Sequence, residues 1–201
     1  MKANVGMRHP VFALVDTYVP ETSISYKDGM VLAEAVSANI SWNRATGSFR
    51  GDDVELDSDN GVLGYQITFE PSGLKDAVRA KLMGETLVTT GTTAYEIDDS
   101  AAPDIGFGYI KVMRETNENG VVVTTYEAWW FRKLKFGITS EEARTKGESI
   151  EWRVPTLTGV GAGILLDTSG KKKFAQHYTY DTYDAAETWL HSKAGISAAT
   201  T

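Results

Sequence analysis

The sequence has no cysteine among its 201 residues. This absence excludes a disulfide framework, a thiolate zinc site and a thiol nucleophile, and it is compatible with either a cytosolic or an extracellular protein. No apolar run approaches the roughly 20 residues that a membrane-spanning helix needs. The first ten residues, MKANVGMRHP, also lack the apolar core of a signal peptide. We therefore expect a soluble protein that is made in a cytoplasm and has no membrane partner.

Positive charge is also scarce. The 20 Lys and Arg residues are outnumbered by 27 Asp and Glu residues, which gives a formal net charge of −7. Proteins that hold nucleic acid by its phosphates do so with clustered Lys and Arg, so this balance argues against a nucleic-acid-binding protein of that kind. The charge balance does not exclude a protein through which nucleic acid moves without being held.

Residue patterns that carry catalysis are missing as well. The three histidines, His9, His177 and His191, are expected in an arm, a strand and a helix, without the H-x-H or H-E-x-x-H spacing of a metal site. We expect each to be a surface or packing residue. Adjacent carboxylates such as Asp52 and Asp53 lie in charged segments, where a solvated surface is the usual role. The sequence therefore predicts neither an enzyme nor a bound cofactor or metal ion.

What the sequence does contain is a clear β pattern. Apolar and polar residues alternate over Val36–Asn43 and again over Leu63–Glu70, which is typical of two half-buried antiparallel strands. Their polar faces are almost uncharged. Such a face either meets another subunit, lines a cavity, or is an ordinary solvent face rich in Ser and Thr. The polar-face residues considered are Ser37, Asn39, Ser41, Gln66 and Thr68.

The stretch from Tyr126 to Gly159 is the most aromatic part of the chain. Trp129 and Phe131 fall on one face of a strand, while Ala128 and Trp130 fall on the other. A strand that is apolar on both faces must be covered on both sides, by a second sheet, a helix or another subunit. A second alternating strand follows. The predicted sheet core comprises Trp129, Trp130, Phe131, Ile150 and Trp152.

Two short helices complete the pattern. One is expected after Ser72 and ends near Met83; the other covers Asp184 to Lys193, with Asp184 and Glu187 as a capping box. About eight strands without βα alternation predict a mainly β fold, an antiparallel β-sandwich or open barrel with one or two short flanking helices. The glycine-rich run 159–163 is expected to be a flexible strand end or loop. We expect a single domain over 1–201, with a flexible arm at 1–10 and a disordered tail at 197–201.

The connection over residues 44–62 is unusually long for a compact domain. It is acidic, but it does not match the calcium-loop pattern D-x-[DN]-x-[DN]-G. When the pattern starts at Asp57, its third ligand position falls on Gly61, and when it starts at Glu55, Asn60 stands in place of the required glycine. A solvated loop or a contact between subunits is the better interpretation.

The order of motifs along nearly the whole chain resembles that of the major tail tube proteins of bacteriophages with long, non-contractile tails. The similar segments are VGMRHPVFA at 5–13, the aspartates at 52–53, GFGYI at 106–110, YEAWW at 126–130, the run at 136–151, PTLTG at 155–159 and AETWL at 186–190.

The resemblance implies a β-sandwich subunit that forms hexameric rings. The rings stack into the tail tube around a tape-measure protein, the tube meets tail tip and tail terminator proteins, and DNA later passes through it without specific binding. The place of action is the virion tail, assembled in the host cytoplasm. The resemblance also implies that loop 44–62 reaches adjoining subunits; its candidate contact residues are Phe49, Arg50, Asp52, Asp53 and Glu55. The alternative is a soluble β-barrel that binds a small ligand. A third interpretation, a hydrolase with an acidic active site, is supported only by carboxylates that form no recognisable catalytic pair.

Overall fold

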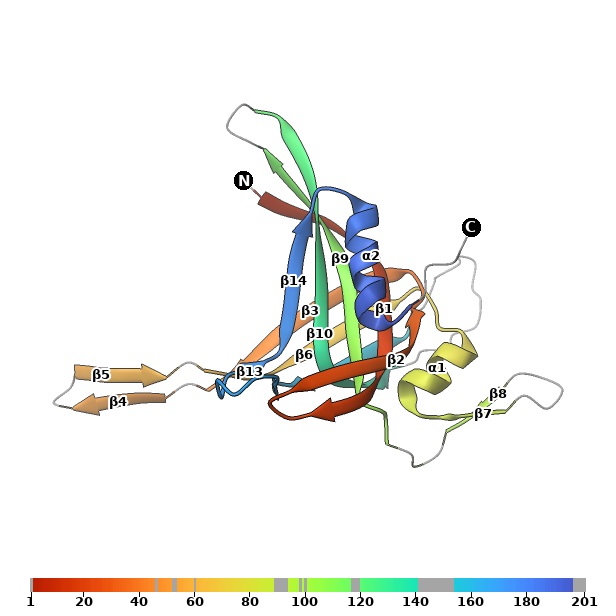
Figure 1. Cartoon of the computed structure of the whole chain (residues 1–201), viewed down its shortest axis with the longest axis horizontal. Helices are drawn as coiled ribbons and strands as arrows, with labels where there is room; N and C mark the ends of the chain where they lie inside the picture. The colour runs from red at the N-terminus through yellow and green to blue at the C-terminus, as the bar shows by residue number, and fades with distance from the viewer. Residues whose placement is uncertain are drawn as a thin grey trace, which may run out of the picture.

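The computed structural model describes residues 2–45, 47–51, 54–59, 61–88, 94–97, 99, 101–116, 120–140 and 154–196. Its centre is an antiparallel sheet with the strand order β2-β1-β9-β10-β11-β6-β3, and β14 also pairs with β10 (Figure 1). The strands of this sheet are β1 (Lys2–Val19), β2 (Ser23–Val31), β3 (Ala35–Arg44), β6 (Val62–Pro71), β9 (Ile105–Thr116), β10 (Val122–Ser140), β11 (Thr156–Ala162) and β14 (Ala175–Tyr180).

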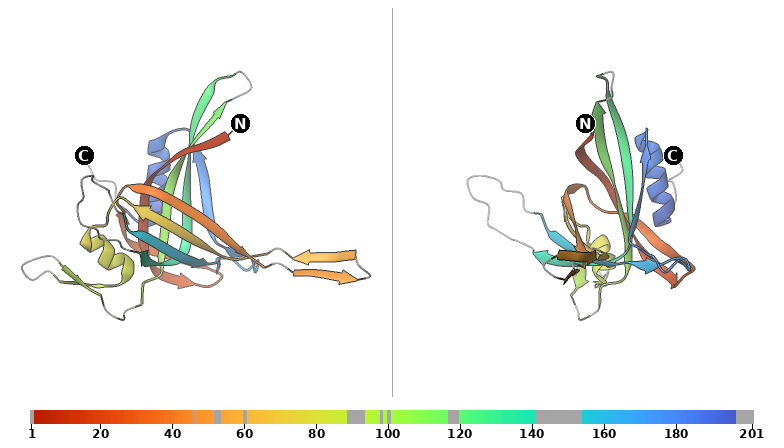
Figure 2. Two further views of the ribbon diagram at one scale, coloured as in Figure 1. Left: turned by 180° about the vertical axis from the view of Figure 1, so that it is seen from behind. Right: turned by 90° about the vertical axis from the view of Figure 1, so that its left-hand side faces the viewer.

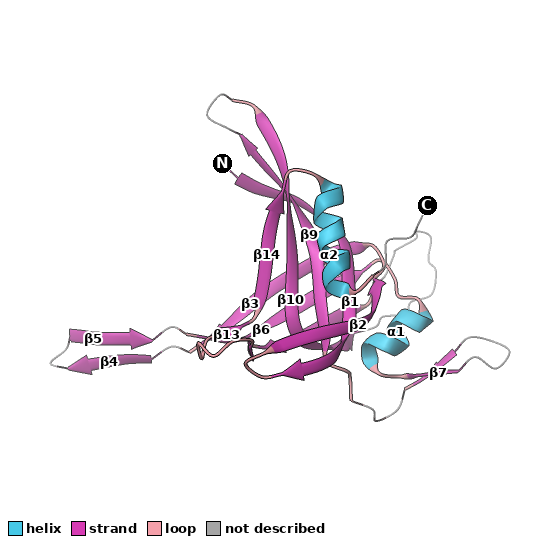
Figure 3. Ribbon diagram, viewed as in Figure 1, coloured by secondary structure: helices cyan, strands magenta, loops and turns pink. Residues whose placement is uncertain are grey.

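Smaller elements surround this sheet. Three two-stranded pairs and two helices are present in the described part of the chain (Figure 3). They are β4 (Gly47–Gly51) with β5 (Val54–Asp59), β7 (Thr86–Val88) with β8 (Ala94–Glu96), β12 (Ile164–Leu165) with β13 (Lys172–Lys173), α1 (Asp76–Met83) and α2 (Tyr183–Ala194). The mainly β, antiparallel fold class with short flanking helices is confirmed. Neither helix is long and apolar enough to cross a membrane.

Strand β10 is covered on both faces, as its sequence predicted. Trp129 and Phe131 face a large aromatic cluster inside the curved sheet, and Phe131 is fully buried. Ala128 and Trp130 face the opposite way, against the buried face of α2. Trp129 is only partly buried, and its ring stacks on His177 with centroids 4.4 Å apart. The cover is therefore a helix on one side and the rest of the sheet on the other. The predicted core residues Ile150 and Trp152 lie outside the described residues.

The interior of the sheet is filled with large side chains. The Phe107 ring is in edge-to-face contact with Phe69 and with Phe136, at centroid distances of 5.4 and 5.3 Å. Helix α1 adds Val78 and Leu82 to the same cluster. Aromatic pairs of this kind stabilise a core beyond the area that they bury. Other buried members of the cluster are Phe12, Leu32, Tyr65, Ile67, Met83, Ile105, Tyr109, Phe131, Leu134 and Leu157.

Gly159 and Gly161, from the glycine-rich run 159–163, lie on one face of β11. Of the two predicted alternatives, a flexible strand end or a loop, a strand end is present over residues 159–162. Gly159 pairs with Ile67 and Gly161 pairs with Tyr65. A Cβ atom at Gly161 would stand 2.1 Å from the Tyr65 ring, and one at Gly159 would stand 2.7 Å from Phe136. The alternate glycines therefore leave space for the aromatic rings of the interior.

The prediction of a flexible arm at 1–10 is wrong for residues 2–10, because these residues form the first half of β1. This half pairs with β9 from Lys2, opposite Glu115, onward. The Lys2 ammonium also lies 2.6 Å from a carboxylate oxygen of Glu127 on β10. The sequence did not predict a strand over the first residues of β1; the long hairpin of β9 and β10 supplies the pairing partner that makes them one. Strand β2 was not predicted either.

Both helices begin differently from the prediction. α1 starts after Lys75 and has no side-chain cap, so Ser72 is not its cap. At α2 the cap is Thr182, whose hydroxyl accepts a hydrogen bond from the Ala185 amide. The predicted capping box is therefore wrong, and Glu187 is turned toward a histidine of β1 instead. Both helices end at a glycine in the left-handed conformation, Gly84 for α1 and Gly195 for α2.

Candidate functional site

The five polar residues singled out in the sequence lie together on one face of the sheet. Register places Ser41 opposite Gln66 and Asn39 opposite Thr68. All of them are exposed except Thr68, which is half-buried, and the Ser37 hydroxyl donates to Glu70 at 2.7 Å. The same face continues onto β11, where Thr158 lies opposite Thr68 and Val160 lies opposite Gln66. We call this surface, Ser37, Asn39, Ser41, Gln66, Thr68, Thr158 and Val160, the polar face.

The residues of the predicted assembly loop lie on a hairpin that projects from the body. Strands β4 and β5 extend well beyond the ends of β3 and β6, toward the left in Figure 1 and the right in the rear view of Figure 2. In this hairpin Arg50 is opposite Glu55, and Phe49 is opposite Asp57. Asp52 and Asp53 fall outside the described residues. Residues 44–62 therefore include a two-stranded ribbon where the sequence predicted a loop.

A second projection was not singled out in the sequence. The far end of the β9–β10 hairpin rises past the body beside the first residues of β1 (Figure 1). It carries exposed valines, of which Val122 is 60% exposed and Val5 is 51% exposed. The signal for it was the run of three valines at 121–123, which places an apolar residue on both faces of a strand. We call Val5, Val121, Val122 and Val123 the valine arm.

A cavity of about 300 Å³ lies between β2, β10, β14 and the end of α2. Its wall includes Arg132, whose Nη2 donates to Gln176 Oε1 at 2.6 Å. The Nε of Arg132 and the Nε2 of Gln176 are buried without an acceptor among the described residues. Burial lowers the pKa of the Arg132 guanidinium and raises the pKa of the neighbouring Tyr26 to about 12.

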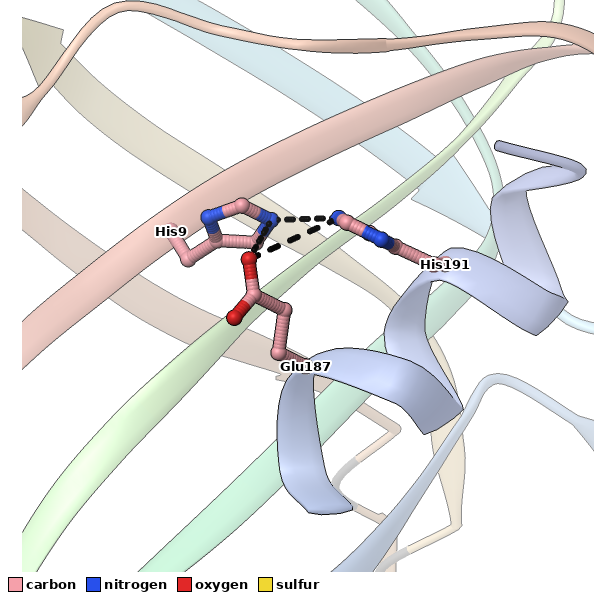
Figure 4. A group of neighbouring side chains, drawn as sticks. All are labelled: His9, Glu187 and His191. Carbon is pink, nitrogen blue, oxygen red and sulfur yellow. Dashed lines mark hydrogen bonds and ion pairs between the residues drawn. The ribbon is translucent and has the colours of Figure 1, made fainter. Parts of the chain in front are cut away.

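A cluster of two histidines and a glutamate lies where α2 faces β1 (Figure 4). His9 Nε2 lies 2.7 Å from His191 Nε2 and 3.4 Å from Glu187 Oε1. Burial, as the largest influence, lowers the pKa of His9. The sequence prediction treated these histidines as separate surface or packing residues. The E-x-x-x-H spacing at 187–191 places two groups on one helix face, but nothing in the sequence indicated that His9 would lie opposite them.

Comparison with known proteins gives a limited similarity. No protein-family model matches the chain. A stretch of 89 residues, 43% of the chain, is 32% identical to part of the genome polyprotein of Ryegrass mosaic virus (isolate Denmark/Danish). The chain spans 3% of the length of that polyprotein.

Proposed function

We propose that this protein is the structural subunit of a bacteriophage tail tube, in which copies form hexameric rings that stack around a central channel. The observation that carries the proposal is an open antiparallel sheet with two hairpins that project beyond its core. Among the described residues, β3 pairs with β6 alone and β2 pairs with β1 alone. Both ends of the sheet therefore keep unpaired backbone donors and acceptors.

Open sheet edges favour association with further copies. Unpaired edges are a template for pairing with another chain, and soluble monomers usually protect them with charge, proline or a covering element. The edge strand β3 has few of these protections: between Ala35 and Asn43 it has no charged residue and no proline. In a ring, each edge would be closed by the neighbouring copy, and a ring of like contacts has no free edge.

The projecting hairpins support stacking of rings. A hairpin that leaves the body buries little of its own surface, so it gains stability when it lies on a neighbour. The valine arm adds exposed apolar surface of the kind that marks protein contacts. In this proposal the β4–β5 hairpin and the valine arm of one ring contact the next ring. The β4–β5 contact residues remain those expected from the sequence: Phe49, Arg50, Asp52, Asp53 and Glu55.

The polar face is proposed to line the channel. Its side chains carry no positive charge, and the chain has a net charge of −7. A wall of this kind does not attract DNA phosphates, so DNA would slide past it, in contrast to the basic groove of a DNA-binding protein. The tape-measure protein would occupy the same channel before DNA, and tail tip and terminator proteins would contact the two ends.

The alternative, a barrel that binds a small ligand, is less well supported. Ligand-binding barrels keep an open interior, whereas the interior of this sheet is filled by Phe12, Tyr65, Phe69, Phe107 and Phe131. The cavity beside Arg132 lies between α2 and the sheet, outside that interior.

A deletion and a pair of substitutions test the proposal. Deletion of residues 49–55 is expected to leave a folded monomer, measured by circular dichroism, that forms no tubes in electron micrographs. Val122→Asp is expected to weaken assembly strongly, because it places a charge in the valine arm. Val122→Thr is the matched control, since it keeps the β-branched shape and should weaken assembly less. Normal tubes from the deletion variant would contradict the proposal.

A further inference from the structure

We propose that His9, Glu187 and His191 form a binding site for a divalent transition-metal ion of the zinc class. One ligand atom from each of the three side chains lies within 4.8 Å of the other two. The site joins β1 to α2, two elements that are distant in the sequence (Figure 4). This inference is independent of the proposed assembly.

The distances are close to those of a tetrahedral site. Zinc binds histidine nitrogen and carboxylate oxygen at about 2.0–2.2 Å, so neighbouring ligand atoms stand about 3.3–3.5 Å apart. His9 Nε2 and Glu187 Oε1 are already 3.4 Å apart, and His191 Nε2 is 3.9 Å from the same oxygen. The two histidine nitrogens, at 2.7 Å, must separate by about 0.6 Å to reach this spacing. Small rotations of the two rings supply that change.

The backbone holds His9 in an uncommon conformation that directs it to α2. His9 has a φ of 53°, in the left-handed region that residues other than glycine rarely adopt. It also precedes Pro10, which favours extended backbone. The conformation coincides with a bulge in the β1–β9 register between Arg8 and Val11. Such outliers are found most often at functional sites.

The helix contributes the other two ligands at suitable spacing. Glu187 and His191 are four residues apart, so their side chains share one face of α2. The three side chains are 15–30% exposed, which shields them from most solvent and still leaves a path for an ion.

The donor set decides the class of ion. Two imidazoles and one carboxylate suit zinc, cobalt or nickel, whereas calcium and magnesium prefer oxygen ligands alone. With three protein ligands, the fourth position is left for water or a side chain from another molecule. The bound ion would fasten the N-terminal half of β1 to α2. It would therefore stabilise the native chain, because the unfolded chain does not hold the three ligands together.

Metal titration tests the proposal. Protein stripped with a chelator is titrated with Zn²⁺ in a calorimeter and with Co²⁺ in a spectrophotometer. We expect one ion per chain, an intense visible absorption from Co²⁺ in a four-coordinate site, a rise in Tm with Zn²⁺, and no effect of Mg²⁺. His9→Ala and His191→Ala are each expected to weaken zinc binding at least tenfold. Changing a group that only supports a metal ligand already weakens metal binding by about tenfold or more, so loss of a ligand should weaken it at least as much.

The third histidine provides a matched control. His177 stacks on Trp129 and is not part of the cluster, so His177→Ala should bind zinc as the unaltered protein does. Circular dichroism of each variant checks that it folds, and His9→Gln serves if His9→Ala does not. The proposal is overturned if the unaltered protein binds no zinc saturably. It is also overturned if folded His9 and His191 variants bind as tightly as the His177 variant; the cluster would then be a hydrogen-bonded histidine pair.

Discussion

Gly108 of β9 lies directly beneath Leu190 of α2: a Cβ atom at Gly108 would stand 2.8 Å from Leu190 Cδ2. The same atom would stand 2.7 Å from the Trp130 ring and 2.6 Å from the Trp129 carbonyl oxygen. The helix therefore contacts the sheet where the sheet has no side chain. The GFGYI motif that supports the family resemblance has this physical role in the fold.

Gly108→Val is expected to destabilise the protein by about 1–3 kcal/mol, because the added methyl groups overfill the space between α2 and β10. The free energy of unfolding in urea measures the change. Gly137→Ala is the matched control on β10, where an added Cβ would meet no atom within 4 Å. Equal stability of the two variants would show that α2 does not lie on Gly108.

The ion pair between Arg79 and Glu85 yields a second prediction. Arg79 is buried, and its Nε lies 3.1 Å from Glu85 Oε2. Glu85→Gln removes the Glu85 carboxylate from this buried guanidinium and should cost about 1–3 kcal/mol. The double variant Arg79→Met, Glu85→Gln removes both charges and should recover part of that loss. A double variant that is less stable than Glu85→Gln would contradict this account.

Alkaline pH should weaken the fold through its buried tyrosines. Burial raises the pKa of Tyr26 from 10.0 to about 12, and burial also raises the pKa values of Tyr65 and Tyr109. Above pH 10.0 the unfolded chain therefore loses protons that the folded chain keeps. The stabilisation is complete below pH 10.0 and is lost as pH rises toward about 12, at about 1.4 kcal/mol per pH unit for each such group.

The measurement for this third prediction is urea unfolding at a series of pH values. Tyr26→Phe lacks the hydroxyl, so its stability should fall less steeply with pH than that of the unaltered protein. At neutral pH the variant should be about 1 kcal/mol less stable, since the hydrogen bond from Tyr26 to the Arg132 carbonyl is lost. Identical slopes for the two proteins would contradict the assignment.

The polar face yields a fourth prediction, and the absence of cysteine makes it simple to test. Gln66→Cys places one thiol on this face. It should react readily with a bulky maleimide in the monomer and slowly in the assembled tube. Ser169→Cys, in the exposed turn before β13, is the control and should react equally in both states. Equal reaction of the Gln66 variant in monomer and tube would place the polar face outside the channel.

The sequence predicted the elements whose side chains alternate or are apolar on both faces. Alternation identified β3 and β6, and the two apolar faces of β10 predicted a cover on both sides, because burial selects such residues directly. Strand β2 was not predicted, since its segment Lys27–Gly29 has no apolar residue and it is held by backbone pairing and by contact of Gly29 with Ala194. A segment of this kind becomes a strand because of its pairing partners elsewhere in the chain, which its own sequence does not reveal.

The candidate sites were predicted to a smaller extent. The polar face follows from strand period and register, and five of its seven residues, those on β3 and β6, could be grouped from the sequence. The histidine cluster could not be, because His9 reaches α2 only through a bulge and a left-handed backbone that no local pattern indicated. The valine arm could not be grouped from the sequence, because Val5 reaches the β9–β10 hairpin only through the pairing of the first residues of β1 with β9.

Electron microscopy of the purified, concentrated protein is the most direct test of the central claim. The account predicts rings and stacked tubes with an open centre, and the number of these should increase with protein concentration. A protein that stays monomeric at every concentration, and whose Tm rises with a small ligand, would contradict the claim and favour a binding module.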